Sequence, residues 1–385
     1  MTPGLLRLIV VLGCVYAGMA GTRTAASLLA LRSDYGAAEL GLLLALFSLS
    51  QVILALPAGR YIDRHGLRRS LVWAVLMSCS GTVLAAAFPI FAMLCGAALL
   101  TGAGAGCAVI ALQRQAGLLT SDPPQLRKVF SWLAVGPTAA NFLGSISAGL
   151  LIDHQGFRVA FAGIAVLPLV GWWLVRRMPA EKPPALTARP DVAVTGSRWD
   201  LVQDPGFRRV MLLNWLVASC WDVHAFLIPL LGHALELSAS AIGAILGAFA
   251  LAATAIRILM PLLARHLREP VVMASTMVVT AVLFGLYPLM QSALGMGVLS
   301  VLLGLALGAG HPMIMSAMHQ ITPPHRHGEA LAFRLMAING SSVVMPLLFG
   351  SVGTLVGTTA IFWSLGALTG ACTHLALGLG KTPST

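Results

Sequence analysis

The sequence predicts an all-α membrane protein with twelve transmembrane helices in two pseudo-symmetric six-helix halves. Three observations support this fold class: an apolar composition, a series of apolar runs that could each cross a bilayer, and one long polar stretch near the middle. Hydrophobic residues make up 58% of the 385 and charged residues only 10%, whereas a soluble domain carries about 25% charge. Lipid must therefore be a large part of the solvent for this chain.

Each predicted helix follows from an apolar run of the length needed to cross a membrane, about 20 residues. The runs are 5–31, 38–58, 70–90, 91–113, 129–151, 159–177, 208–232, 238–262, 271–290, 294–318, 329–353 and 357–379. The first run continues well past Ala17–Ala20, which faintly resembles a signal-peptidase site, so we expect an uncleaved helix.

One long polar segment interrupts the series. Residues 178–206 contain five prolines and mixed charges, a composition that suits a flexible linker and not a membrane span. The sequence therefore predicts an N-terminal bundle (1–177), a cytoplasmic linker (178–206) and a C-terminal bundle (207–385).

The net charge of +11 comes from short basic clusters in alternate connections, after the even-numbered helices. These residues are Arg60, Arg64, Arg68, Arg69, Arg114, Arg127, Lys128, Arg176, Arg177, Lys182, Arg189, Arg198, Arg208, Arg209, Arg265, Arg268 and Arg326. The opposite loops carry little beyond Arg32 and Arg158. This positive-inside pattern predicts a multi-pass protein of the bacterial inner (plasma) membrane with both termini in the cytoplasm. A nucleic-acid partner is not expected, because such a protein concentrates its basic residues on one polar domain.

The cysteines give no sign of a disulfide or a metal site. All six lie inside apolar runs and no CxxC occurs, so they read as small buried residues. No cofactor or metal is expected.

The two halves look related by an internal repeat. A shift of about 201 residues places Gly149 on Gly350, Gly156 on Gly357 and Phe161 on Phe362. Several coincidences at one offset indicate a repeat. Two six-helix halves with a site between them at mid-membrane are a known transporter plan.

The loop after the second run has a specific pattern. Residues 59–69 read GRYIDRHGLRR, which closely resembles the major facilitator superfamily signature G-x3-D-R-x-G-x-R-R/K. Gly59 should let its helix approach a neighbour closely, Gly66 should permit a tight turn, and Asp63 can accept charge-assisted hydrogen bonds. The resemblance implies that this gating loop, with Arg64 and Arg68, helps to hold one gating state.

Two further patterns resemble motifs of that family, and the first of them is typical of its exporters. Gly136-Pro137 in the fifth helix is similar to an antiporter motif, although Ala140 and Asn141 replace its usual paired glycines. Asp153-x-x-Gly156-Phe157-Arg158 matches a common junction between helices 5 and 6. We therefore expect an exporter, with uptake left open.

Ionisable residues inside membrane helices are costly and usually face a cavity. Arg23 and His224 are equivalent under the repeat, and the family's cavity is lined by the helices that carry them and Asp222. On one reading Arg23 binds an anionic group and Asp222 or His224 takes up protons. On the other, Arg23 and Asp222 form an ion pair that closes a gate, and the two are compatible if the pair breaks during transport.

Four other side chains are candidates for substrate binding. His311 follows Gly308-x-Gly310 and precedes Pro312, where an interrupted helix would expose backbone groups to a cavity. Arg334 shares a run with Asn339, Ser341 and Ser342, which suggests a polar face, and Asn141 and Asn339 could hydrogen-bond a solute. For Arg257 we expect snorkelling to the headgroups, with substrate binding as the alternative.

Together these residues predict a secondary active transporter of a small organic solute, working as a monomer by alternating access. Basic side chains outnumber the lone acid Asp222, so an organic anion is the favoured cargo. No nucleotide-binding loop occurs, so protons are the expected energy source. An enzyme is not expected, since the polar residues are scattered one or two per helix. A transport-inactive sensor or scaffold on the same fold is the alternative.

Overall fold

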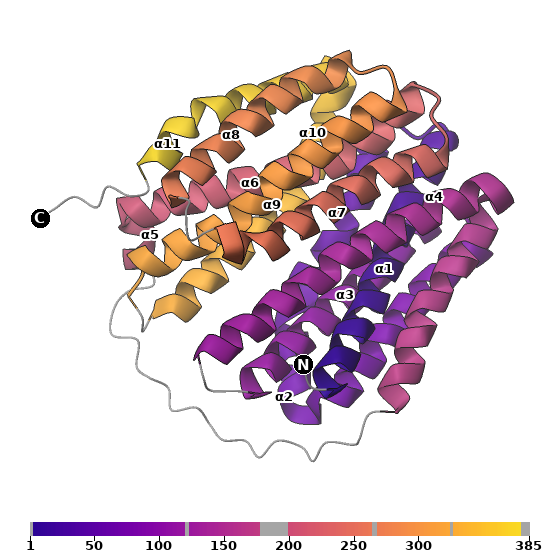
Figure 1. The fold of residues 1–385 in the computed structure, drawn as a ribbon. Helices are drawn as coiled ribbons and strands as arrows, with labels where there is room; N and C mark the ends of the chain where they lie inside the picture. The colour runs from indigo at the N-terminus through magenta and orange to yellow at the C-terminus, as the bar shows by residue number, and fades with distance from the viewer. Residues whose placement is uncertain (1–2, 120–122, 178–198, 264–267, 324–325, 379–385) are drawn as a thin grey trace, which may run out of the picture.

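The structure is a computed structural model that describes residues 3–119, 123–177, 199–263, 268–323 and 326–378. Every regular element in these ranges is a helix (Figure 1). The first group is α1 (Pro3–Arg32), α2 (Ala37–Ala87), α3 (Phe91–Leu119) and α4 (Pro123–Arg176). The second is α5 (Trp199–Gln203), α6 (Pro205–Ala234), α7 (Ala239–Leu263), α8 (Glu269–Leu286), the 3-10 helix η1 (Tyr287–Leu289), α9 (Ala293–Ile321), α10 (His327–Ala371) and α11 (Thr373–Leu377).

The described helices contain eleven segments long and apolar enough to cross a membrane. One of them, Ala139–Arg176, has 38 residues and turns at Gly156, so it is long enough for two crossings. Twelve crossings result, as the sequence predicted. Asp153 and Gly156 lie in the turn between the two crossings of α4, outside the membrane-spanning segments.

Three glycines make the sharp turns inside the long helices. Gly66 in α2, Gly156 in α4 and Gly357 in α10 have φ of 79°, 82° and 79°. Their ψ values of 175°, 175° and 162° put them in a region that is essentially restricted to glycine. The turn expected at Gly66 is confirmed, and Gly156 and Gly357 make the same turn 201 residues apart.

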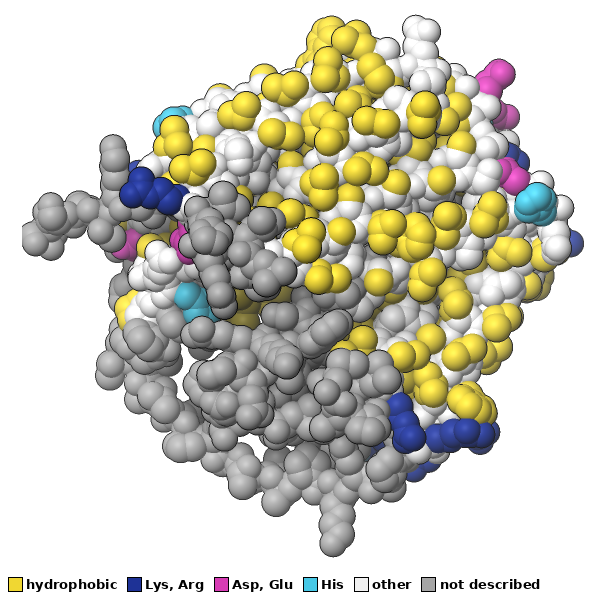
Figure 2. Space-filling model, in the orientation of Figure 1, with side chains coloured by type: hydrophobic (Ala, Val, Ile, Leu, Met, Phe, Trp, Pro, Cys, Tyr) yellow, Lys and Arg dark blue, Asp and Glu magenta, His cyan; other side chains and the backbone are white. Residues whose placement is uncertain are grey.

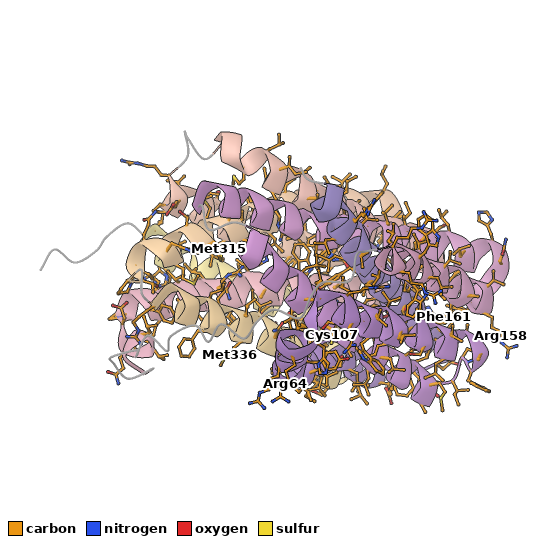
Figure 3. All side chains as sticks on the ribbon, turned by 90° about the horizontal axis from the view of Figure 1, so that it is seen from below. Arg64, Cys107, Arg158, Phe161, Met315 and Met336 are labelled. Atoms are coloured by element: carbon orange, nitrogen blue, oxygen red, sulfur yellow. The ribbon has the colours of Figure 1, made fainter. Side chains whose placement is uncertain are left out.

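The helices form two bundles, α1–α4 and α6–α11, which lie side by side in Figure 1. We call the end with Gly66, the last turn of α4 and the start of α6 the linker end, and the end with Gly156 and Gly357 the distal end. Arg158 lies at the distal tip of the first bundle and Arg64 toward its other end (Figure 3). The predicted linker 178–206 lies outside the described residues except for its last part, which holds α5. The domain boundaries stay a prediction.

The bundles meet mainly through two helix pairs, α4 with α7 and α2 with α10. In both seams glycine packs on backbone: a Cβ on Gly149 would stand 2.4 Å from the carbonyl oxygen of Ala239, and one on Gly350 would stand 2.6 Å from that of Ala37. These repeat-related glycines thus make equivalent contacts with the opposite bundle, which supports the internal repeat.

The outer surface is apolar, as a lipid-facing surface must be. Leu294, Met336 and Ile53 are 80%, 65% and 61% exposed, and hydrophobic side chains spread over the visible face of the bundles in Figure 2, with charged groups toward its margins. The interior is filled by large side chains such as Phe161 and Phe362, the repeat-related pair, both fully buried.

Candidate functional site

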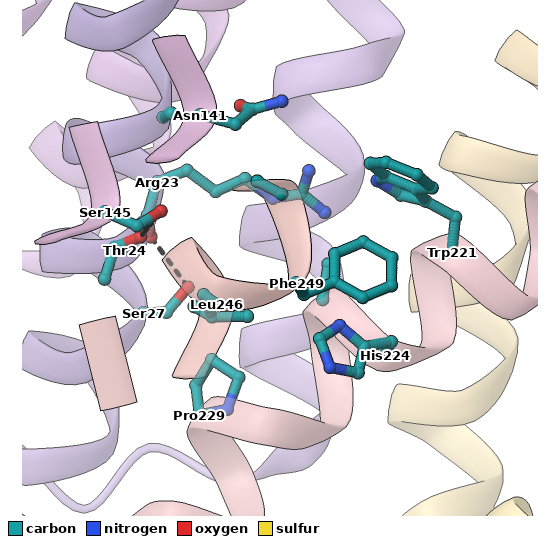
Figure 4. Close-up of a pocket in the computed structure, with 13 residues that line it drawn as sticks. Arg23, Thr24, Ser27, Asn141, Ser145, Trp221, His224, Pro229, Leu246 and Phe249 are labelled. Carbon is teal, nitrogen blue, oxygen red and sulfur yellow. Dashed lines mark hydrogen bonds between the residues drawn. The ribbon is translucent and has the colours of Figure 1, made fainter. Parts of the chain in front are cut away.

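A cavity of about 70 Å³ lies between the bundles (Figure 4). Helices α1 and α4 line it from one side, and α6 and α7 from the other. Its walls are Ala20, Arg23, Thr24, Ser27, Asn141, Ser145, Trp221, His224, Ala225, Pro229, Leu246, Phe249 and Ala250. Three residues predicted from the sequence, Arg23, Asn141 and His224, therefore face one common space.

Close packing of α1 on α4 positions the N-terminal wall of the cavity. A Cβ on Gly144 would stand 2.4 Å from the carbonyl oxygen of Ala17, so only a glycine permits this approach. Thr24 donates a hydrogen bond to Ser145 across the same contact, at 3.1 Å. Arg23 is held one residue earlier on α1, and in Figure 4 its side chain reaches across the cavity toward Trp221.

Asp222 lies on α6 beside the cavity, where the hydroxyls of α10 surround its carboxylate. Ser341 donates to Oδ2 at 3.0 Å, and Ser342 contacts Oδ1 and Oδ2 at 2.9 and 3.1 Å. Arg23 interacts electrostatically with this carboxylate. Within the described residues no hydrogen bond joins the two, so the structure brings the predicted partners together without closing a direct ion pair. The polar face predicted for the helix of Ser341 is confirmed.

His224 is fully buried in a polar network of the second bundle. Its Nε2 lies 2.9 Å from the hydroxyl of Ser300 and 3.3 Å from that of Tyr287. Tyr287 also contacts Ser300 and donates to the carbonyl of Met296 at 3.1 Å. The ring stacks on Phe249 with centroids 4.2 Å apart, and Nδ1 has no partner among the described residues.

Arg257 from α7 and His311 from α9 lie next to Trp221, and Arg334 from α10 is close enough to Arg257 and His311 to act on both electrostatically. The Arg257 Cζ lies 5.3 Å from the centroid of the Trp221 ring, and the His311 ring lies 6.1 Å from it. The snorkelling expected for Arg257 is wrong, because the contact with Trp221 directs its side chain into the protein. In the sequence analysis each of these residues is considered separately, because nothing in the sequence indicates that they meet.

The predicted interruption of the helix near His311 is also wrong. Helix α9 runs from Ala293 to Ile321 through Pro312 without a break. His311 reaches the site through its side chain, with Nδ1 unpaired in the described part of the chain. Asn339, the last predicted candidate, lies on α10 two residues before Ser341 and is partly buried.

The gating loop is at the linker end. Arg68 donates to the carbonyl of Arg176 at 3.3 Å, which joins the loop to the end of α4, and Arg64 is exposed. A Cβ on Gly59 would meet nothing within 4 Å, so the close helix approach predicted for this glycine is wrong in this conformation. The side chain of Asp63 lies outside what the structure describes.

Asp153 at the distal end has a role that sequence reasoning missed. Its Oδ1 accepts the amide of Ala239 at 3.0 Å and its Oδ2 the amide of Ser240 at 2.7 Å, both in the first turn of α7. Burial acts to raise the pKa of Asp153, but hydrogen bonds from Ser240 and Ala239 and the charge of Arg32 outweigh it and lower that pKa. The carboxylate therefore caps a helix of the opposite bundle.

No metal centre is evident in the described ranges, where no three His, Cys, Asp or Glu side chains gather. The arrangement instead offers hydrogen-bond donors, positive charge and aromatic faces to a solute.

The comparison with known protein families identifies one family. The model described as Major Facilitator Superfamily matches residues 8–220 and 210–385. No curated protein matches the sequence significantly.

Several solved structures share the fold. A structure of the nucleoside transporter NupG has a TM-score of 0.80 at 11% identity and covers 98% of this chain and 100% of its own. A structure of a POT family transporter in complex with 5-aminolevulinic acid has a TM-score of 0.75 at 13% identity, and the match covers 97% of this chain and 95% of that one. A structure of the human organic anion transporter MFSD10 has a TM-score of 0.66 at 19% identity, and the match covers 97% of this chain and 100% of that one. At these identities the likeness concerns the fold alone.

Proposed function

The chain belongs to the major facilitator superfamily, and we propose that it is a secondary active transporter that exports a small organic anion by alternating access in exchange for protons. The observation that carries the proposal is the cavity between the bundles, to which both contribute polar side chains, Arg23 and Asn141 from one and His224 from the other. A solute held there contacts both bundles, so its binding is coupled to their relative movement.

The preference for an anion rests on charge. Arg23 lines the cavity, Arg257 lies over Trp221 in its wall and Arg334 lies close to Arg257, whereas Asp222 is the acid that faces Arg23. The excess of cations favours an anionic cargo. The organic anion transporter with the same fold is consistent with this choice.

Asp222 is the proposed proton carrier. When its carboxylate is charged it attracts Arg23, and when it is protonated that attraction is lost, so uptake or release of one proton changes the contact between the two bundles. The charged and the protonated forms would then favour different conformations of the transporter. We further propose that the protein is a monomer in a bacterial inner membrane with both termini in the cytoplasm.

Transport is tested with purified protein in proteoliposomes, using a panel of labelled organic anions, cations and neutral solutes with and without an imposed pH gradient. The expected result is flux of an anion that the gradient accelerates. Flux confined to cations would overturn the anion assignment, and no flux from folded, monodisperse protein would favour the sensor or scaffold. Uphill movement with the proton flow instead of against it would identify an uptake symporter.

The proton carrier is tested with Asp222→Asn. This variant should keep solute exchange at equal pH but lose accumulation driven by the gradient, because an amide cannot bind and release a proton. The matched control is Asp204→Asn: Asp204 caps α6 by accepting the Phe207 amide at 2.6 Å, and asparagine caps equally well. Unchanged accumulation in Asp222→Asn would remove Asp222 from the role.

A further inference from the structure

Trp221 and three basic side chains linked to it by pairwise contacts form a group that we call the cationic cluster: Trp221, Arg257, His311 and Arg334. They come from four helices of the second bundle, α6, α7, α9 and α10. All four are partly exposed, while neighbours such as Asp222, Ala253 and Met313 are buried. Trp221 also lines the cavity, so the cluster adjoins that cavity through this ring.

The cluster concentrates positive charge. Arg257 and Arg334 are close enough to repel each other electrostatically, and His311 lies in the field of both. Nε of Arg334 and Nδ1 of His311 are buried and have no hydrogen-bond partner in the described ranges. Donors of this kind, brought together in a low-dielectric region, favour a negatively charged ligand that accepts from several of them.

The N-terminal wall does not offer the same site. Arg23 has Asp222 as a counter-charge, so an anion must compete there with a carboxylate of the protein itself. For Arg334 no hydrogen bond or ion pair with a carboxylate is found among the residues described, and the charged groups that interact with it, Arg257 and His311, are bases. The stronger attraction for an anion therefore lies on the second bundle.

Aromatic rings continue the surface from the cluster into the cavity. The Trp221 ring meets Phe249 edge-on, with centroids 4.5 Å apart and planes at 71°, and both rings line the cavity (Figure 4). A solute with a charged group at one end and an apolar body next to it would match this sequence of surfaces. Guanidinium groups suit planar carboxylates and phosphoryl groups because they present two parallel N–H donors.

Resting on the proposed transport function, we infer that Arg257, His311 and Arg334 form an oxyanion subsite that holds the carboxylate or phosphoryl group of an organic acid whose carbon skeleton packs on Trp221 and Phe249. The shared chemistry is an oxyanion attached to an apolar, preferably aromatic, body. This assignment separates the roles of the arginines: the second bundle binds the cargo, and Arg23 responds to the protonation of Asp222.

Binding is measured on the purified full chain in nanodiscs by isothermal titration and by tryptophan fluorescence. The probes are benzoate, phenyl phosphate, the neutral isostere benzamide and the cation benzylamine. We expect one or both oxyanions to bind and the other two to bind at least 10-fold more weakly. The probe that binds more tightly, benzoate or phenyl phosphate, identifies the type of oxyanion. Equal binding of benzamide, or no binding of either oxyanion at millimolar concentration, would overturn the subsite.

Variants locate the site. Arg334→Gln should weaken oxyanion binding roughly 10- to 100-fold, as loss of charge-assisted hydrogen bonds predicts, and Arg334→Lys should restore part of it if folding is intact. The matched control is Arg209→Gln, because Arg209 donates to the carbonyl of Gly378 at 2.8 Å and lies about 18 Å along α6 from Trp221. Fluorescence quenching by the probe should disappear in Trp221→Phe. Equal weakening in the two glutamine variants, or unchanged quenching in Trp221→Phe, would contradict the placement.

The binding result is independent of transport. If the oxyanions bind as described but no solute crosses proteoliposomes, the transport function fails and the subsite stands. If proteoliposomes transport a cation or a neutral solute and Arg334→Gln has no effect on it, transport stands and the subsite fails.

Discussion

Asp153 should hold the distal end closed, and removing its side chain should open it. The carboxylate on α4 accepts two amides from the first turn of α7, so the two bundles cannot separate at that seam without breaking both hydrogen bonds. The change is Asp153→Ala, with Asp153→Asn as a milder variant that loses the charge but keeps one acceptor oxygen.

The magnitude follows from the number and the setting of these bonds. A hydrogen bond to a charged group contributes about 1.5–3 kcal/mol, but Asp153 is exposed, and water replaces both bonds on opening. We therefore assign about 1–2 kcal/mol to the pair together. That free energy corresponds to a roughly 5- to 30-fold shift of the equilibrium toward the distal-open state.

The shift is measured by double electron–electron resonance between spin labels on the two bundles. Ile90 and Leu294, which are 58% and 80% exposed at the distal end, are replaced by cysteine in a chain whose six native cysteines have been removed. Asp153→Ala should increase the long-distance population, Asp153→Asn less so, and Asp204→Asn at the linker end should leave it unchanged. Identical distributions in the parent and in Asp153→Ala would refute the reasoning.

The effect of pH has a definite sign. The closed state lowers the pKa of Asp153 below its ordinary value of 3.8, so the charged form stabilises closure. This stabilisation of the closed state is fully present above the ordinary pKa of Asp153, and it is lost as the pH falls through the lowered pKa of the closed state. Asp153 itself should therefore cause no opening between about pH 6 and 8. If the difference between the parent and Asp153→Ala vanished within that window, the assignment would be wrong.

Three other substitutions test the fold around the site. Gly156→Ala should destabilise the protein by about 1–3 kcal/mol because the backbone conformation of Gly156 excludes a side chain. The control Gly285→Ala should not, because a Cβ on Gly285 would meet no atom within 4 Å. Equal thermal unfolding midpoints for the two variants would contradict this. Gly243→Leu should also open the distal end, since its Cβ would stand 2.4 Å from the Ser145 carbonyl oxygen; unchanged spin-label distances would argue against it. Tyr287→Phe should cost about 1 kcal/mol through the hydrogen bond lost to Met296, seen as a lower unfolding midpoint; a midpoint at or above the parent's would show that this bond contributes nothing.

The sequence predicted the parts of the fold that depend on local or periodic signals. Apolar runs of membrane length located the crossings, and the turn at Gly66 followed from a short motif. The internal repeat predicted that Gly156 and Gly357 occupy equivalent positions. These features need no knowledge of which helices touch, so sequence alone was sufficient.

The site was only partly predictable, because its chemistry depends on contacts between helices distant in sequence. Arg257, His311 and Arg334 lie on three helices, and their meeting beside Trp221 is a property of packing. Arg257 was misread because its distance from the end of its run was the available signal. Asp153 matched a motif, but its partners on α7 are 86 and 87 residues away.

The glycine seams have a consequence for the speed of the conformational cycle. Gly149 and Gly350 press against main-chain atoms of the other bundle, so at these two contacts no side chain has to change rotamer before the surfaces part. Interdigitated side chains would add an activation barrier to each transport cycle. At these glycine contacts, separation of the bundles is limited by the entry of water and by the polar contacts between them. The carboxylate of Asp153 can therefore govern how often the distal end opens.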